Sequence, residues 1–230
     1  MNEDSANSVE IIKPTQVDID FIIEAIIEAD KSNTERISYC NIFNLSLTEF
    51  KDILRNILKE DIEGQEFCLS NFLIAKVNGK NAGACCSWIE AIDEIPSYLI
   101  KYSLLAQYLD EENIKHSKEI APFIKGLHID REKLTLQIES VYVNENFRSL
   151  GISSKIINEH FRQNKIKRPD LEKSQLIVAK ENDSALNVYK KLGFTVAKEL
   201  KVDNDKILSI LPSNCLVLME KDLKDFQYYT

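Results

Sequence analysis

The chain has 230 residues, of which 44% are hydrophobic and 29% charged, and its formal net charge at pH 7 is −8. This length and apolar content suffice for a full core, and no run approaches the roughly 20 apolar residues of a membrane span or the pattern of a secretion signal. We therefore expect one cytoplasmic domain over residues 1–230, flexible at residues 1–8. The cysteines lack the paired spacing of metal ligands, so we expect buried thiols and no metal at Cys40, Cys68, Cys85, Cys86 and Cys215.

The first part of the chain combines strand and helix patterns. Residues 9–13 form a short apolar run typical of a strand, and residues 17–29 repeat isoleucine at helical spacing, which predicts an amphipathic helix. Ser46-Leu-Thr-Glu49 is a capping box, in which the serine and glutamate side chains satisfy free N–H groups where a helix starts. Apolar residues at helical spacing follow it, so we expect a second helix there.

A hairpin and an extra segment come next. Two strands are predicted at residues 72–77 and 82–89, because the Asn78-Gly79 pair between them is typical of a tight hairpin turn. Residues 90–130 then include a predicted helix at 97–109. Its aromatic and aliphatic stripe could pack on the sheet, pack against a partner chain or cover a binding site. The stripe consists of Tyr98, Leu99, Tyr102, Leu105, Tyr108 and Leu109.

A strand that runs through a glycine into a helix is the first functional signal. Residues 134–143 show strand alternation, and the apolar residues after Gly151 recur at helical spacing. At such a junction the first N–H groups of the helix have no partners, and the helix dipole favours an anion. Gly151 has no Cβ, so it allows a bulky diphosphate to approach the backbone. We expect the N–H groups of residues 149–153 to bind the phosphates.

The same arrangement is repeated once. Residues 175–179 form a short apolar strand, and Asn182 or Asp183 can cap the helix that follows. Gly193 is placed to end that helix. Phe194 then leads into a strand at residues 195–201, and residues 214–220 supply a last strand.

Residues 137–194 resemble the acetyl-CoA-binding core of the GNAT N-acetyltransferase family. Val143, Arg148, Gly151 and Ser153 correspond to its pyrophosphate loop, and its second motif corresponds to Asn182, Ala185, Tyr189, Gly193 and Phe194. The resemblance implies a mixed α/β fold with a central, mostly antiparallel sheet flanked by helices, and residues 90–130 inserted between strands 3 and 4. It also implies acetyl-CoA as the cofactor. Ser149 and Ser153 replace small residues that the family prefers, but neither change removes a backbone N–H.

The resemblance also implies roles for individual residues. The backbone of the strand ending at Val143 would pair with the pantetheine arm of coenzyme A, and the Val141 N–H would bind the thioester oxygen. Asn182 would bind that arm or act only as a helix cap. Tyr189 would protonate the departing thiolate, or it could be a core tyrosine. Phosphate contacts would come from Arg148, Ser149, Leu150, Gly151, Ile152 and Ser153.

Two residues are candidates for the general base. Glu139 belongs to the strand that the family directs towards the acceptor, although it could also be a solvent-facing strand residue. His128 has an intrinsic pKa near neutrality but lies at the margin of the insertion. Some members of this family use no dedicated base.

The charge distribution is uneven. Residues 144–193 carry ten lysines and arginines against six aspartates and glutamates, a balance of +4 that leaves −12 for the remainder. A local basic region suits an anionic cofactor, whereas nucleic-acid binding needs a broader basic surface. The same lysines could simply solvate two helices.

The sequence therefore predicts an N-acetyltransferase that acts on a primary amine of a small molecule, peptide or protein. We expect no nucleic-acid or membrane partner, and the sequence is compatible with a homodimer. The main alternative is a catalytically silent acyl-CoA sensor or interaction module on the same fold. A nucleotide-binding enzyme that uses the Gly151 loop for another diphosphate is disfavoured, because it gives the second motif no role.

Overall fold

The computed structural model describes residues 8–204 and 206–226 and contains one seven-stranded sheet. The strands are β1 (Val9–Ile12), β2 (Phe72–Val77), β3 (Lys80–Ile89), β4 (Leu136–Val143), β5 (Lys173–Ala179), β6 (Thr195–Lys201) and β7 (Cys215–Asp222). Their spatial order is β1-β2-β3-β4-β5-β7-β6, and only β4 and β5 are parallel neighbours. This confirms the predicted mixed, mostly antiparallel sheet. The terminus expected to be flexible lies, up to residue 7, outside the described residues.

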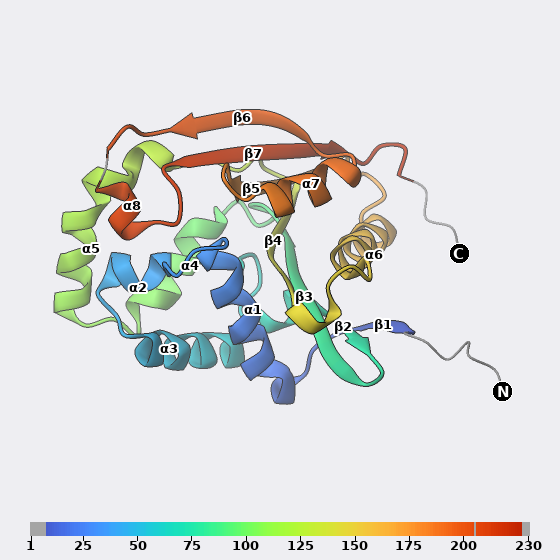
Figure 1. Cartoon of the computed structure of the whole chain (residues 1–230), viewed down its shortest axis with the longest axis horizontal. Helices are drawn as coiled ribbons and strands as arrows, with labels where there is room; N and C mark the ends of the chain where they lie inside the picture. Colours follow the sequence, from blue (N-terminus) through green and yellow to red (C-terminus); the bar gives the residue numbers. More distant parts are fainter. Residues whose placement is uncertain (1–7, 205, 227–230) are drawn as a thin grey trace.

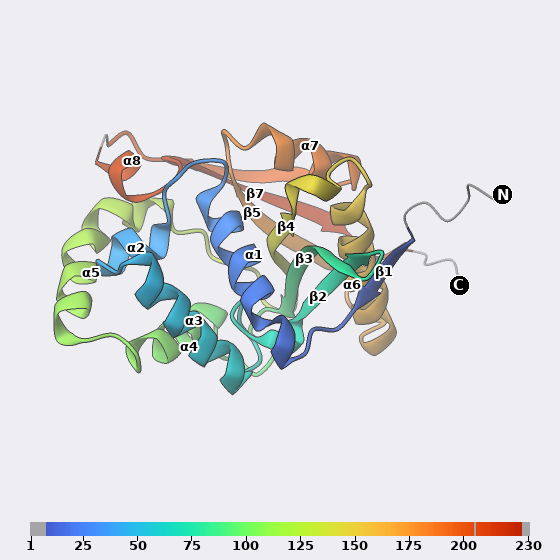
Figure 2. The same cartoon turned by 60° about the horizontal axis from the view of Figure 1, so that its bottom comes forward.

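Helices cover both faces of the sheet (Figure 1). They are α1 (Ile19–Lys31), α2 (Ser38–Phe43), α3 (Leu47–Glu60), α4 (Ser97–Ala106), α5 (Glu111–Ile124), α6 (Ile152–Lys167), α7 (Asp183–Lys191) and α8 (Ile207–Ile210). Figure 2 shows α1 to α4 grouped together, with α6 beyond the hairpin of β2 and β3. None of the helices in the described residues combines the length and apolarity needed to cross a membrane.

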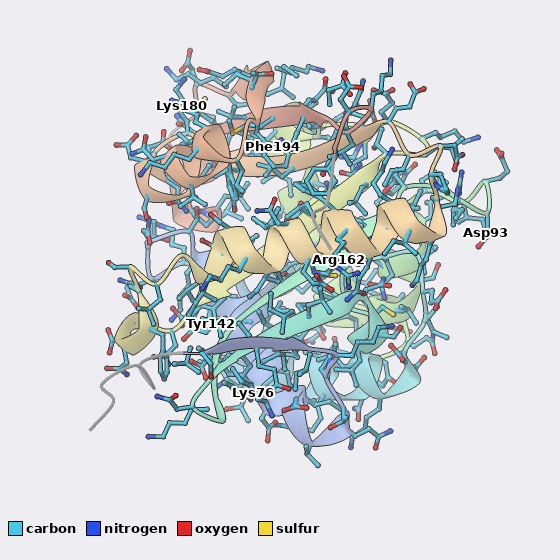
Figure 3. All side chains as sticks on the ribbon, turned by 90° about the vertical axis from the view of Figure 1, so that its right-hand side faces the viewer. Lys76, Asp93, Tyr142, Arg162, Lys180 and Phe194 are labelled. Atoms are coloured by element: carbon cyan, nitrogen blue, oxygen red, sulfur yellow. The ribbon has the colours of Figure 1, made fainter. Side chains whose placement is uncertain are left out.

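The sheet separates two apolar cores, and β2 contributes to both. Phe72 and Ile74 pack with α1, α3 and α4 on one side, whereas Leu73 and Ala75 pack with α6 and α7 on the other. Successive side chains of a strand point to opposite faces, so a strand covered on both sides is apolar throughout. Figure 3 shows α6 lying across its face of the sheet.

Two local predictions are confirmed in atomic detail. The Ser46 N–H donates to Glu49 Oε2 at 2.8 Å and the Glu49 N–H donates to Ser46 Oγ at 3.2 Å, which completes the capping box of α3. Asn78 and Gly79 have φ values of 51° and 76°, the left-handed pair that a tight hairpin turn requires.

The insertion lies between β3 and β4 and carries a helix from Ser97, as predicted, but its details differ. The helix predicted at 97–109 ends at Ala106, and a second helix, α5, follows it. The predicted stripe is not one packing face: Leu105 is fully buried, but Tyr98 and Tyr102 are 42% and 49% exposed. The side of α4 that faces the core is instead formed by Ile100, Leu104 and Leu105. The two leucines follow Ile100 by four and five residues and so lie on the same side of the helix.

Gly83 fixes the distance between β3 and the start of α6. A Cβ at this position would lie 2.7 Å from the Tyr142 carbonyl oxygen and 2.9 Å from Ile152 Cγ2. We expect Gly83→Ala to lower the free energy of unfolding by about 1–3 kcal/mol, the usual cost of overpacking, as measured by urea denaturation. Gly126→Ala is the comparison, because its added Cβ would lie 2.6 Å from a side-chain methyl of Val202 and not from a backbone atom. Equal stability losses in the two variants would contradict this reading of Gly83.

Candidate functional site

A deep cleft opens where β4 and β5 separate. The two strands pair only at Leu136 with Ser174 and at Gln137 with Gln175, and beyond these positions they diverge. The resulting cleft has a volume of about 1000 Å³ and is lined by β4, β5, the start of α6, α7 and the end of α1. The divergence leaves backbone N–H and C=O groups of β4 without a neighbouring strand on this side.

A bulge in β4 increases this effect. Ala84 pairs with Tyr142 and Cys86 pairs with Glu139, so two residues of β4, Ser140 and Val141, lie opposite one residue of β3. Ser140 adopts a left-handed φ of 51°. A bulge leaves its extra residue out of the hydrogen-bonded ladder. Ser140 and Val141 both line the cleft, at the height where the candidate base Glu139 also lines it.

The loop between β4 and α6 forms one end of the cleft. Gly151 caps α6 with a left-handed φ of 69°, and Ser149 has a φ of 68°. Alternation of left-handed residues at a helix start turns successive N–H groups to one side and suits an anion. Arg148 is exposed and lines the cleft, and it makes no ion pair with any residue that the structure describes.

The structure brings most of the predicted loop residues to the cleft. Arg148, Ser149, Gly151, Ile152 and Ser153 line it, together with Val141 and Val143 of β4. Leu150 does not: its side chain packs against the core on the α6 side. A Cβ at Gly151 would meet no atom within 4 Å, so its left-handed backbone and not a close contact explains the glycine.

Tyr189 and Asn182 belong to the second motif and also line the cleft. The ring of Tyr189 is 8% exposed and packs against Phe194 with centroids 6.1 Å apart. Its hydroxyl has no hydrogen-bond partner among the described residues, and no buried polar side-chain atom there is without a partner. The hydroxyl therefore reaches the cleft. Burial raises the pKa of this phenol well above its usual range, and the negative charge of Glu139 adds to the shift.

Asn182 performs the predicted capping role and makes a further contact. Its Oδ1 accepts hydrogen bonds from the Ala185 N–H at 3.2 Å and from Asn33 Nδ2 at 2.9 Å, and its Nδ2 donates to Ser32 Oγ at 3.1 Å. The end of α1 is thereby joined to the start of α7 across the mouth of the cleft.

Glu139 is not a solvent-facing strand residue, which corrects that alternative. It accepts a hydrogen bond from the Arg131 guanidinium, and the side chains are 23% and 15% exposed. Arg131 also donates to Gln137 Oε1 at 2.5 Å and lies 5.1 Å from the Trp88 ring centroid. Burial raises the pKa of Glu139, and the charge of Glu66 adds to this, although Arg131 acts in the opposite direction.

A second, partly buried charge pair completes the inner end of the cleft, and no sequence pattern predicted it. Lys101 Nζ donates to Glu66 Oε1 and to the Tyr39 hydroxyl, both at 2.9 Å, and the Tyr39 hydroxyl donates to Glu66 Oε1 at 2.6 Å. Burial opposes ionisation of Glu66, but the charges of Lys101 and Arg131 lower its pKa. Nearby, Asp30 accepts the Ser38 N–H at 2.6 Å, and burial raises the pKa of Asp30 to about 6.

The residues at the inner end come from separate parts of the chain. They lie at the end of α1, on α2, in the loop before β2, on α4 and in the segment before β4. No motif links them in sequence. Lys101 lies between Tyr98 and Tyr102 of the predicted stripe, and nothing in that pattern marks it as a site residue.

The other candidates lie outside the cleft. His128 is more than half exposed, interacts with Asp130 at 3.1 Å and does not line the cleft. The five cysteines are free, and all except the half-buried Cys40 are buried. Within residues 8–204 and 206–226, no three or more histidine, cysteine or acidic side chains are grouped so that they could hold a metal ion.

A buried histidine predicts a pH effect on stability. His160 Nε2 donates to the Cys85 carbonyl oxygen at 2.9 Å, so Nδ1 accepts from the Ser87 hydroxyl at 2.7 Å, and the ring is neutral. Burial lowers its pKa from 6.5 to about 4. The unfolded chain takes up this proton at a higher pH than the folded chain. The free energy of unfolding therefore has its full contribution from His160 above pH 6.5 and loses up to about 3 kcal/mol as the pH approaches 4.

Urea denaturation at several pH values measures this effect. His160→Gln should lower stability at pH 7.5 but remove this part of the decline between pH 6.5 and 4. Parallel profiles of the two proteins would contradict the assignment. The comparison is needed because Asp30, whose pKa is raised, contributes with the opposite sign in an overlapping range.

Comparisons with known proteins agree with this geometry. A family model described as the acetyltransferase (GNAT) family matches residues 37–194. An N-acetyltransferase structure from Staphylococcus aureus Mu50 has 18% identity and a TM-score of 0.62, covering 92% of this chain and 100% of that one. Arylalkylamine N-acetyltransferase 2 from Aedes aegypti has 16% identity and a TM-score of 0.58, covering 94% and 100%. No functionally curated protein matches the sequence.

Proposed function

The chain belongs to the GNAT acetyltransferase family, and on that basis we propose that it transfers the acetyl group of acetyl-CoA to a primary amine by direct attack. One observation carries the proposal: a free arginine, a helix start suited to anions, an unpaired strand edge, a phenol and a buried carboxylate all line the same cleft. Each of these groups matches one requirement of acyl transfer from a thioester that is attached to a diphosphate.

The chain offers a fitting site for coenzyme A. Arg148 and the N–H groups of residues 149–153 would hold the diphosphate. The serines at 149 and 153 leave the number of these N–H groups unchanged. The open edge of β4 from Val141 to Val143 would hydrogen-bond the amide groups of the pantetheine arm. Asn182, which bridges the mouth, would exchange part of that bridge for a contact with the arm. When bound, acetyl-CoA supplies an activated acyl group and a thiolate leaving group.

Three groups would then act at the reacting atoms. Glu139 would accept a proton from the acceptor ammonium, and its raised pKa brings it closer to that task. The Val141 N–H, on the bulge, would stabilise negative charge on the carbonyl oxygen. The Tyr189 hydroxyl, which is protonated at neutral pH, would donate a hydrogen bond to the leaving sulfur.

Isothermal titration with acetyl-CoA, and with ATP and NAD as controls, tests the cofactor assignment. We expect micromolar binding of acetyl-CoA alone, followed by release of free thiol when amines are added. Arg148→Ala should weaken binding about tenfold, the effect of losing a hydrogen bond to a charged group. Lys155→Ala, an exposed lysine of α6 outside the cleft lining, is the control.

The outcomes separate the candidate functions. Binding of acetyl-CoA without thiol release across amine classes would favour the silent sensor. Equal binding of ATP or NAD would contradict the loop assignment. An unchanged dissociation constant for acetyl-CoA in Arg148→Ala would contradict the assignment of Arg148 to the phosphate site.

We also propose that the chain works as one domain in the cytoplasm. The two cores are joined through the same strands, β2 and β3, and separation of the molecule into halves would expose both. The free thiols suit a reducing compartment.

A further inference from the structure

The inner end of the cleft holds more carboxylates than cations. Asp30, Glu66 and Glu139 line it together with Lys101 and Arg131. Charges removed from water are tolerated where they are paired, so the pairing of this group indicates which charge a ligand must bring.

Both cations already have carboxylate partners. Lys101 donates to Glu66 at 2.9 Å, and Arg131 donates to Glu139 and stacks on Trp88. Asp30 is different, because the groups that donate hydrogen bonds to it, in Ser38 and Tyr39, are neutral. When all these groups are ionised, one negative charge is therefore left without a cation at the inner end.

Two carboxylate oxygens are also free. Glu66 accepts its hydrogen bonds from Tyr39 and Lys101 at Oε1, and Glu139 accepts from Arg131 at Oε1. Neither Oε2 has a hydrogen-bond partner among the residues described, and no buried polar side-chain atom of those residues is left without one. Both Oε2 atoms therefore reach the cleft and can accept a hydrogen bond from a ligand.

The two carboxylates occupy different places along the cleft. Glu139 is close enough to the phenol of Tyr189 for its charge to act on that group, after the larger effects of burial and Cys85. Glu66 is held by α4 and by Tyr39 of α2, on the side of the cleft formed by the helices. A ligand that reaches both would have one hydrogen-bond donor at the reacting end and another further in.

Building on the proposed function, we propose that the acceptor is an aliphatic diamine or polyamine, acetylated on the amine at Glu139 and held by a second ammonium at Glu66. Asp30 and Glu66 are close enough for their charges to interact, so a second ammonium at Glu66 supplies the cation that the inner end lacks. An acceptor with a carboxylate, such as an amino acid, would instead add to the surplus of negative charge.

Three four-carbon probes that differ in charge test this inference. Putrescine, butylamine and γ-aminobutyrate are titrated into the complex of the protein with coenzyme A, so that binding is measured without turnover. We expect putrescine to bind at least about tenfold more tightly than butylamine, the effect of one added hydrogen bond to a charged group. γ-Aminobutyrate should bind most weakly. Equal affinities, or tightest binding of γ-aminobutyrate, would overturn the inference.

Two variants should move the preference in opposite directions. Glu66→Gln should lower the affinity for putrescine to that for butylamine. Lys101→Met removes a cation that competes for Glu66 and should raise the affinity for putrescine. A loss of folding would lower both, so opposite shifts identify the charge effect. Glu112→Gln removes the same charge from an exposed position of α5 and should change nothing. Lower affinity for putrescine in both cleft variants would argue against the proposed site.

Thiol release from acetyl-CoA is followed separately with the same probes. Selective binding of putrescine without thiol release would overturn the proposed function and leave the ligand preference intact. Thiol release from all amines without a preference for putrescine would leave the function intact and overturn this inference.

Discussion

Replacement of Tyr189 by phenylalanine is expected to lower kcat at least about a hundredfold, the lower bound for loss of a positioned proton donor. The hydroxyl reaches the cleft, and its raised pKa keeps it protonated at neutral pH. Phenylalanine retains the ring that packs on Phe194. The dissociation constant for acetyl-CoA should therefore change little, and thiol release with a saturating amine together with titration calorimetry measures both quantities.

Tyr108→Phe provides the matched control for this experiment. It removes a hydroxyl that donates to Glu60 on the outside of the protein. The control should have the kcat of the original protein. If Tyr189→Phe turned over as fast as the control, the phenol would be a packing residue and the leaving sulfur would take its proton from elsewhere.

The second large effect is expected for Glu139→Gln. Glutamine keeps the shape of the side chain but cannot accept the acceptor proton, so kcat/KM should fall about a hundredfold at neutral pH. In the original protein activity should be lost as the pH falls through the raised pKa of Glu139, because only the carboxylate accepts a proton. This acidic limb should be absent in the variant.

Stability must be checked beside activity for this variant, since Arg131 loses its charged partner. Glu132→Gln is a suitable control, because Glu132 is exposed and pairs with Lys173 outside the cleft. A variant that is folded, as active as the control and unchanged in its pH profile would show that the reaction proceeds without a base at position 139.

The parts of the protein that sequence predicted correctly depend on neighbouring residues. The capping box at Ser46, the turn at Asn78-Gly79 and the cap at Asn182 each involve groups within three residues of one another. The start of α6 at Gly151 is local in the same sense, because the end of a strand and a glycine define it. These features can be recognised without knowing how the chain folds back on itself.

The inner end of the cleft could not be predicted in this way. Tyr39, Glu66 and Lys101 are separated by 27 and 35 residues yet share hydrogen bonds. Arg131 and Glu139 are close in sequence, but nothing in the strand pattern showed that the glutamate would be buried. Tertiary contact decides such groups, and a single sequence carries little information about it.

The insertion and its first helix were predicted, but the packing side of α4 and the presence of α5 were not, for a related reason. Leucine and tyrosine occur around most of α4, so spacing did not identify which side would face the core. α5 contains Pro122, a residue that usually interrupts a helix, and it has no buried residue that would mark a side facing the core.

The divergence of β4 from β5 has a consequence for aggregation. Every unpaired strand edge can recruit another extended chain, and a sheet with a gap has two edges more than a continuous one. Here the additional edges face each other inside a cleft whose sheet faces are covered by helices. They accept a narrow, extended ligand, but the strand of a second protein would have to displace α1 or α7 first. The fold thus keeps open hydrogen-bonding groups for binding and still protects them from aggregation.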